Sequence, residues 1–140
     1  MNGSGEVNFQ SIQVGDALPE LRATMDRETY FAYNQLIRNM NPLHSDQNYA
    51  MRMGYRDIVV AGVYTFSFIP KMIEDWIGPA GRVAAIAIKY ASPIYIGGTI
   101  VQTARVTRKS SSPPSLEIEV TVRDLNGNTL KSATVKLEPA

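Results

Sequence analysis

Residues 61–77 are the most apolar segment of the chain, and they limit its possible folds more than any other stretch. Wound as a helix, they place large apolar side chains on nearly every side, and a helix of this kind is stable only when it is buried. Pro70 lacks a backbone N–H, so we expect it to kink the helix or to split it in two. Gly78 and Pro79 mark its end. The rest of the chain must therefore cover a central helix.

After Gly81 the spacing of apolar residues changes from helical to alternating, which is typical of strands with one buried face. The dipeptide Asn126-Gly127 predicts a tight hairpin turn. A flexible loop is expected at residues 110–114. The predicted strands cover residues 84–90, 99–107, 116–122 and 130–137. A buried helix followed by antiparallel strands predicts an α+β fold, in which a sheet curls around the helix.

The first part of the chain is predicted to be mostly helical. After a short extended piece at residues 21–24, Asp26 is a suitable N-cap because its carboxylate can accept from free N–H groups of the first turn. This helix should end near Arg38. Asp46 is predicted to cap a second, short helix that Gly54 stops.

Length and composition favour one globular domain, residues 1–140, and exclude several functions. The net charge of +1 gives no indication of nucleic-acid binding, and there is no apolar run long enough for a membrane span. The absence of cysteine and the single histidine argue against a metal site, and we expect no cofactor. Residues 1–5 lack the apolar core of a signal peptide, so a cytoplasmic protein is expected.

The chemically informative stretch is residues 39–46, with the sequence N-M-N-P-L-H-S-D, followed by Ala50 and Gly54. It closely resembles the D-x-N-P-x-H-x-D signature of the MaoC-like (R)-specific hydratases and dehydratases. Further landmarks of that family match at residues 14–16, 60–62 and 76–79. The resemblance extends over nearly the whole chain, from about residue 14 to residue 137.

This resemblance implies a hot-dog fold and action on a coenzyme A or acyl-carrier-protein thioester. In the family, an aspartate and a histidine hold the water that adds to a trans-2-enoyl thioester, or the hydroxyl that leaves a (3R)-hydroxyacyl thioester. The histidine corresponds to His44. The first peptide N–H groups of the buried helix, here at Ala61 and Gly62, would polarise the thioester carbonyl. Tyr64 and Phe66 are candidates for the acyl pocket.

Asn39 stands where the family has its aspartate. An amide cannot accept a proton from water, although it can still orient a water or a hydroxyl. Three explanations remain open at this stage. Asn39 is a natural loss in a non-catalytic or partner-dependent subunit, an engineered substitution that traps substrate, or a sign of retuned chemistry in which His44 works alone.

The remaining motif residues have simpler structural explanations. Asn41 and Pro42 are expected to shape the turn, and Asp46 to cap the helix after it. Four methionines are interpreted as adaptable core filler rather than as a cofactor site, namely Met40, Met51, Met53 and Met72.

The first hypothesis for function is therefore a hydratase or dehydratase of acyl thioesters. The alternatives are a non-catalytic hot-dog subunit that supports an active dehydratase partner, and an acyl thioesterase. We expect a homodimer or a higher homo-oligomer, because the edge strands of the sheet need covering, and a heterodimer is the alternative.

Overall fold

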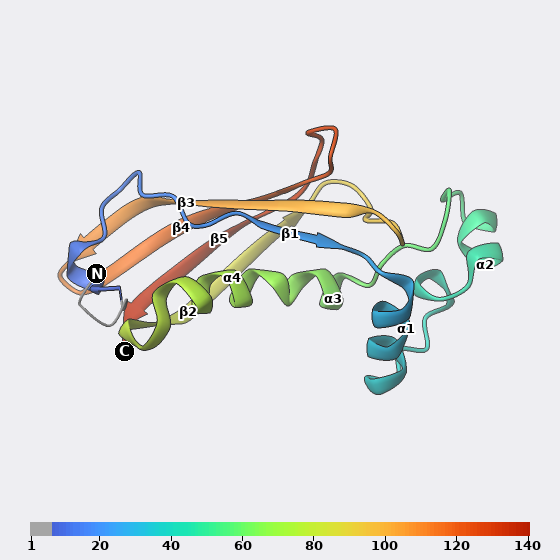
Figure 1. Ribbon diagram of the computed structural model, residues 1–140, viewed down its shortest axis with the longest axis horizontal. Coiled ribbons are helices and arrows are strands. Elements are labelled where there is room, and N and C mark those ends of the chain that lie inside the picture. The colour runs from blue at the N-terminus through green and yellow to red at the C-terminus, as the bar shows by residue number, and fades with distance from the viewer. Residues whose placement is uncertain (1–6) are drawn as a thin grey trace.

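The computed structural model describes residues 7–140, so the prediction about residues 1–5 lies outside the described residues. In Figure 1 a curled antiparallel sheet lies over a helix that follows one of its faces. The five strands are arranged in the order β1-β3-β4-β5-β2. They are β1 (Leu21–Thr24), β2 (Gly81–Tyr90), β3 (Thr99–Ser111), β4 (Pro114–Arg123) and β5 (Thr129–Pro139). The α+β prediction is confirmed.

The helix on the sheet is split, as Pro70 predicts. It consists of α3 (Gly62–Phe66) and α4 (Phe68–Ile77), with Ser67 between them. Pro70 lies in the first turn of α4, where backbone N–H groups have no partner inside the helix. Its missing N–H therefore removes no helical hydrogen bond. Burial is one-sided: Ile69 and Ile73 face the sheet and are inaccessible to solvent, whereas Val63 is 52% exposed. Burial on all sides, which the sequence predicts, is therefore not reached within one chain.

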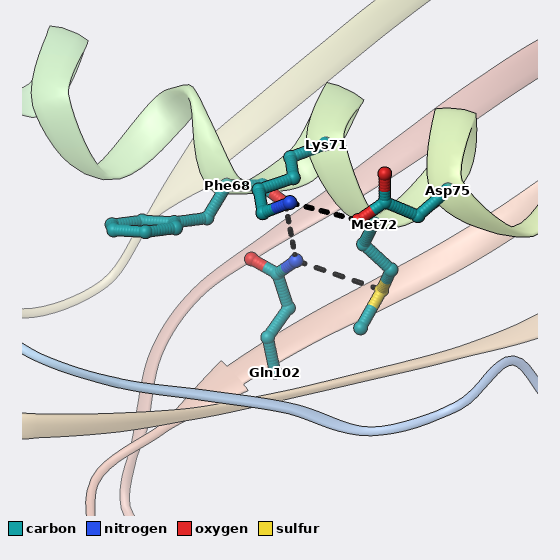
Figure 2. Close-up of polar contacts among 5 residues, drawn as sticks. All are labelled: Phe68, Lys71, Met72, Asp75 and Gln102. Carbon is teal, nitrogen blue, oxygen red and sulfur yellow. Dashed lines mark hydrogen bonds and ion pairs between the residues drawn. The ribbon is translucent and has the colours of Figure 1, made fainter.

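The buried side chain of Gln102 links the sheet to α4. Figure 2 shows Gln102 of β3 reaching up to the helix, where its Nε2 donates to the carbonyl of Phe68 at 2.9 Å. The same nitrogen lies 3.5 Å from the sulfur of Met72. The ion pair between Lys71 and Asp75, at 2.9 Å, belongs to the exposed part of the helix. Gln102 has no exposed surface, so this contact is a buried polar link between β3 and α4.

The core has two parts. One lies between α4 and the long strands and includes Ile73, Val106 and Ile118. The other lies where α3 begins and includes Tyr30 and Tyr64. Its location matters for function, because α1 (Arg27–Leu36) and α2 (Gln47–Arg52) gather at that end of the sheet and carry the motif between them.

The predicted caps are present. Asp26 accepts from Thr29 N at 2.9 Å, and the hydrogen bonds from Thr29 lower the pKa of this carboxyl group. Helix α1 ends at Leu36, two residues before the predicted end. Arg38 follows with φ +54°, a left-handed conformation that favours glycine, and it turns the chain into the motif.

Two strand predictions are wrong in detail. The predicted loop at residues 110–114 is almost entirely strand, because Ser110 and Ser111 pair with the beginning of β4. Strand β2 begins at Gly81 rather than at the predicted residue 84, and a bulge between Val83 and Ala85 shifts its register, so that Val83 is half-buried and Ala84 is exposed. Residues 7–140 contain no helix long and apolar enough to cross a membrane.

Lys131 of β5 is a charged residue on the core face of the sheet. It is 1% exposed, and its Nζ donates to Thr65 Oγ1 of α3 at 2.8 Å. The ring of Tyr90 lies 5.9 Å away, measured from Nζ to the ring centroid. Burial lowers the pKa of Lys131 from 10.5 to about 8, because the surroundings disfavour the charged form.

We predict that Lys131→Met stabilises the protein at neutral pH, by at most a few kcal/mol, because it removes a buried charge and keeps the volume. Below pH 8 the folded and unfolded chains both carry the proton, so the cost of burial is fully present. Between about pH 8 and 10.5 only the unfolded chain is charged, and the parent's free energy of unfolding rises with pH relative to that of the variant. Urea denaturation at pH 7 and pH 9.5 measures the difference. Lys136→Met, on the exposed face of the same strand, is the control and should change neither value.

Candidate functional site

The motif forms a tight turn between α1 and α2. Asn41 Oδ1 accepts from Leu43 N at 3.0 Å, and Pro42 begins a single 3-10 turn that ends at His44. Asp46 Oδ1 accepts from Tyr49 N at 3.1 Å and caps α2, as the sequence predicts. These three residues shape the loop, and their side-chain contacts are structural.

The imidazole of His44 is held in one orientation. Its Nδ1 lies 2.8 Å from the main-chain oxygen of Val59. A carbonyl oxygen only accepts, so Nδ1 carries a proton, and in the neutral ring Nε2 keeps its lone pair. His44 is half-buried, which leaves the ring open to solvent or substrate. The ring is therefore fixed through Nδ1, and Nε2 is the nitrogen that remains available to a further partner.

The side chain of Asn39 is half-buried and engaged within the same turn. Its Oδ1 accepts from Asn41 N at 3.1 Å, and its Nδ2 lies 3.5 Å from Asn34 Oδ1. A pocket of about 540 Å³ opens beside it. This pocket is lined by Phe31, Asn34, Gln35, Arg38, Asn39, Met40 and Ser45. Asn39 thus faces a space that a small organic group can enter.

Asn34 connects the two candidate catalytic positions, a role that sequence reasoning missed. It is buried on α1, contacts Asn39 through Oδ1, and donates from Nδ2 to the main-chain oxygen of His44 at 3.2 Å. The available signal was a polar residue four positions after Tyr30, on the face of the helix that the aromatic residues bury.

Tyr30 links the motif to the start of α3. Its hydroxyl donates to the main-chain oxygen of His44 at 2.8 Å and accepts from Ala61 N at 2.9 Å. The side chain has no exposed surface. Burial raises the pKa of Tyr30, so the hydroxyl keeps its proton and both hydrogen bonds at neutral pH.

The structure brings Ala61 and Gly62 close to the motif through Tyr30. Ala61 is buried immediately before α3, and Gly62 begins the helix. A Cβ atom on Gly62 would lie 3.4 Å from the hydroxyl of Tyr90, so that ring closely approaches the helix start. Glycine leaves the peptide accessible at this point.

The two candidates for the acyl pocket lie elsewhere. The ring of Tyr64 is buried in an aromatic cluster, 5.2 Å from Tyr30, 5.0 Å from Tyr33 and 5.6 Å from Phe68 between centroids. Phe66 is half-buried on α3. Neither lines the pocket beside Asn39.

The prediction that the methionines fill the core is wrong for three of the four. Met72 is 5% exposed, but Met40, Met51 and Met53 are 88%, 55% and 53% exposed. Met40 lies in the motif, Met51 on α2, and Met53 immediately after α2. Among residues 7–140, no group of three or more His, Cys, Asp and Glu side chains could hold a metal ion.

The family model of the MaoC-like domain matches residues 9–128. The chain is 27% identical over 127 residues to the 3-oxo-4,17-pregnadiene-20-carboxyl-CoA hydratase beta subunit of Mycobacterium tuberculosis, covering 89% of this chain and 94% of that protein. It is 24% identical over 100 residues to the (R)-specific enoyl-CoA hydratase of Rhodospirillum rubrum, covering 71% and 69% of the two chains. The fold matches a chain of the ChsH1-ChsH2 complex from Mycobacterium tuberculosis with a TM-score of 0.81, at 25% identity and 91% and 98% coverage.

The protein therefore belongs to the MaoC-like dehydratase domain family, whose named members include hydratases and dehydratases of acyl thioesters. Its curled sheet around a central helix is the hot-dog fold, as the resemblance of the motif implies.

We predict that Tyr30→Phe lowers the free energy of unfolding by about 1–3 kcal/mol, because the buried N–H of Ala61 loses its acceptor. Tyr33→Phe is a matched control. Its ring also packs on Tyr64, but its hydroxyl makes no hydrogen bond among the described residues. Chemical denaturation of both variants tests the difference, and equal losses would contradict the bridging role of Tyr30.

Proposed function

We propose that this chain provides the site for reversible hydration of trans-2-enoyl thioesters and dehydration of (3R)-hydroxyacyl thioesters. The observation that carries the proposal is the state of His44: its ring is held through Nδ1 by Val59 and presents a free Nε2 within the motif of the family. The names of the relatives support the reaction class, because they include an enoyl-CoA hydratase and 3-hydroxyacyl dehydratases.

In the hydration direction, the oxygen of water forms a bond to C3 of the enoyl group. The C2–C3 π electrons then move toward the thioester carbonyl, and an enolate forms. Nε2 of His44 takes the proton that the water loses and returns a proton to C2, which completes the addition. The first peptide N–H groups of α3, at Gly62 and Val63, stabilise the charge on the carbonyl oxygen, whereas the N–H of Ala61 already donates to the hydroxyl of Tyr30.

Asn39 makes this site unusual. Its amide orients the water or hydroxyl, but the proton transfer that an aspartate would perform falls to His44 alone. We therefore propose an impaired or retuned site. The second candidate function, a subunit that supports an active partner, is favoured by the same Asn39 and by the relative that is named a beta subunit.

The acyl thioester carries coenzyme A or an acyl-carrier protein, and no cofactor enters the proposed reaction. The pocket beside Asn39 supports the entry of a substrate group at this end of the sheet. We also propose that Tyr64 and Phe66 contact the acyl group. Because the ring of Tyr64 packs on Tyr30 and Phe68, an acyl chain would have to enter this aromatic cluster to contact it.

We predict that Asn39→Asp raises hydration of a short enoyl-CoA by about 10²-fold or more, because it restores a carboxylate that accepts a proton. The hydrogen bond from Asn41 N to Oδ1 is compatible with either side chain. The carboxylate would also face Asn34 Oδ1, which favours the protonated form and strengthens its basicity. Loss of the enoyl absorbance reports the rate, release of free thiol reports hydrolysis, and thermal melting verifies folding.

Asn41→Asp makes the same chemical change two residues away, on a side chain that only shapes the turn, and should give no gain. Adding His44→Ala to Asn39→Asp should abolish the gain. A folded Asn39→Asp variant that binds an acyl thioester and shows no gain would favour the supporting-subunit function. Thiol release without hydration would favour a thioesterase.

We also propose a homodimer or a higher homo-oligomer, with a heterodimer as the alternative. Strand β2 is a ten-residue sheet edge, and exposed apolar side chains surround the motif. These are Leu36, Ile37, Met40, Met51 and Met53. Light scattering at micromolar concentration should give at least twice the chain mass of 15.5 kDa. A stable monomer would contradict self-association and favour a different partner chain.

A further inference from the structure

The buried ammonium group of Lys131 has no carboxylate to balance it. The ion pairs among residues 7–140 do not include Lys131, and Nζ makes one hydrogen bond, to Thr65 Oγ1 at 2.8 Å. An ammonium group has three donor hydrogens, so most of its hydrogen-bonding capacity is unused in this part of the chain. Burying such a charge is costly, and a position that keeps it needs an explanation beyond packing.

Thr65 passes the influence of Lys131 to the start of α3. While Oγ1 accepts from Lys131 Nζ, its hydroxyl donates to the main-chain oxygen of Gly62 at 3.2 Å. That oxygen belongs to the peptide group whose N–H is on Val63. Hydrogen bonds in a chain polarise one another, so an ammonium at one end makes the peptide N–H at the other a stronger donor.

We propose that Lys131 is a positioning residue for the thioester carbonyl: acting through Thr65, its charge polarises the Gly62–Val63 peptide and stabilises the enolate oxygen. The inference rests on the proposed function, because it deepens the role of the same site. Lys131 does not touch the substrate in this account. It supplies a fixed positive charge within the protein, where low polarity makes that charge effective.

The groups around Lys131 are consistent with a lone cation. Strand β2 presents Tyr90, whose ring is 5.9 Å from Nζ, and α3 presents the neutral Thr65. Strand β4 places Val122 opposite Lys131 in the register. Tyr90 is thus the titratable side chain that the structure places against it. The lowered pKa of about 8 leaves the ammonium mostly charged at neutral pH and neutral above that value.

The test uses 4-(dimethylamino)cinnamoyl-CoA, an enoyl thioester that absorbs at longer wavelength when its carbonyl is polarised. Bound to the unmodified chain, the probe should show a red shift that decreases as the pH rises through about 8. Lys131→Met and Thr65→Val should bind the probe with similar affinity and lose most of the shift at every pH. Thr65→Ser keeps the hydroxyl and should restore the shift. Lys136→Met removes an exposed lysine from the same strand and should have no effect.

A kinetic arm in the Asn39→Asp background adds a second readout. Lys131→Met should lower kcat about tenfold with little change in KM, because the polarised peptide matters most when the enolate forms. A general loss of structure would not lower kcat while leaving KM unchanged. If Lys131→Met does not fold, Thr65→Val tests the same hydrogen-bond chain.

Different results would contradict the role of Lys131 and the proposed function. If the unmodified chain binds and polarises the probe, and both Lys131→Met and Thr65→Val keep the full shift, the role of Lys131 is overturned and the proposed function stands. If the unmodified chain neither binds nor polarises any of the probe, the proposed function itself is contradicted, and the inference falls with it.

Discussion

The hydroxyl of Tyr30 joins two parts of the chain that must be fixed relative to each other for any chemistry at this site. It donates to the main-chain oxygen of His44 and accepts from Ala61 N, so the motif turn and the start of the buried helix share one atom. The hydroxyl is inaccessible to water, and both contacts satisfy backbone groups. Asn34 adds a second bond to the same oxygen of His44. The position of the motif turn thus depends on polar side chains of α1.

The fold was predictable where local rules and tertiary packing agree. Asp26 and Asp46 cap the predicted helices, and Pro70 accompanies a divided central helix, because each effect acts over a single turn. The errors arose where pairing with another strand decides. Ser110 and Ser111 have the composition of a loop, but the ladder between β3 and β4 extends them. The bulge in β2 is also set by the neighbouring strand, and no residue there signals it.

For the site, the sequence predicts His44 and Asn39 as candidate residues because their spacing in the motif is local. It did not identify the side chains that hold them. The bond from Tyr30 to Ala61 joins residues 31 positions apart, and the tie from His44 to Val59 spans 15. Which polar group satisfies a buried carbonyl depends on the final packing, so periodicity cannot reveal it. Lys131 is in phase with the buried residues Ala133, Val135 and Leu137, so alternation alone would place it on the core face, but a lysine is expected on an exposed face and the apolar Leu130 beside it obscures the pattern.

Lys131 is a residue that stability disfavours, and Asn39 is a residue that the reaction of the family disfavours. A methionine at position 131 would avoid the desolvation of an ammonium, so in the proposed role the lysine reduces stability in return for an electrostatic effect near Gly62. At position 39 an amide removes a negative charge that the family places opposite its histidine. Behind the helix start, the cation of Lys131 donates a hydrogen bond to Thr65 of α3. If Lys131 has the proposed role, a site with an amide at position 39 and a buried positive charge favours stabilisation of an enolate oxygen over activation of water. In such a site, polarisation of the thioester carbonyl and transfer of the proton would be controlled by different residues and could be changed separately.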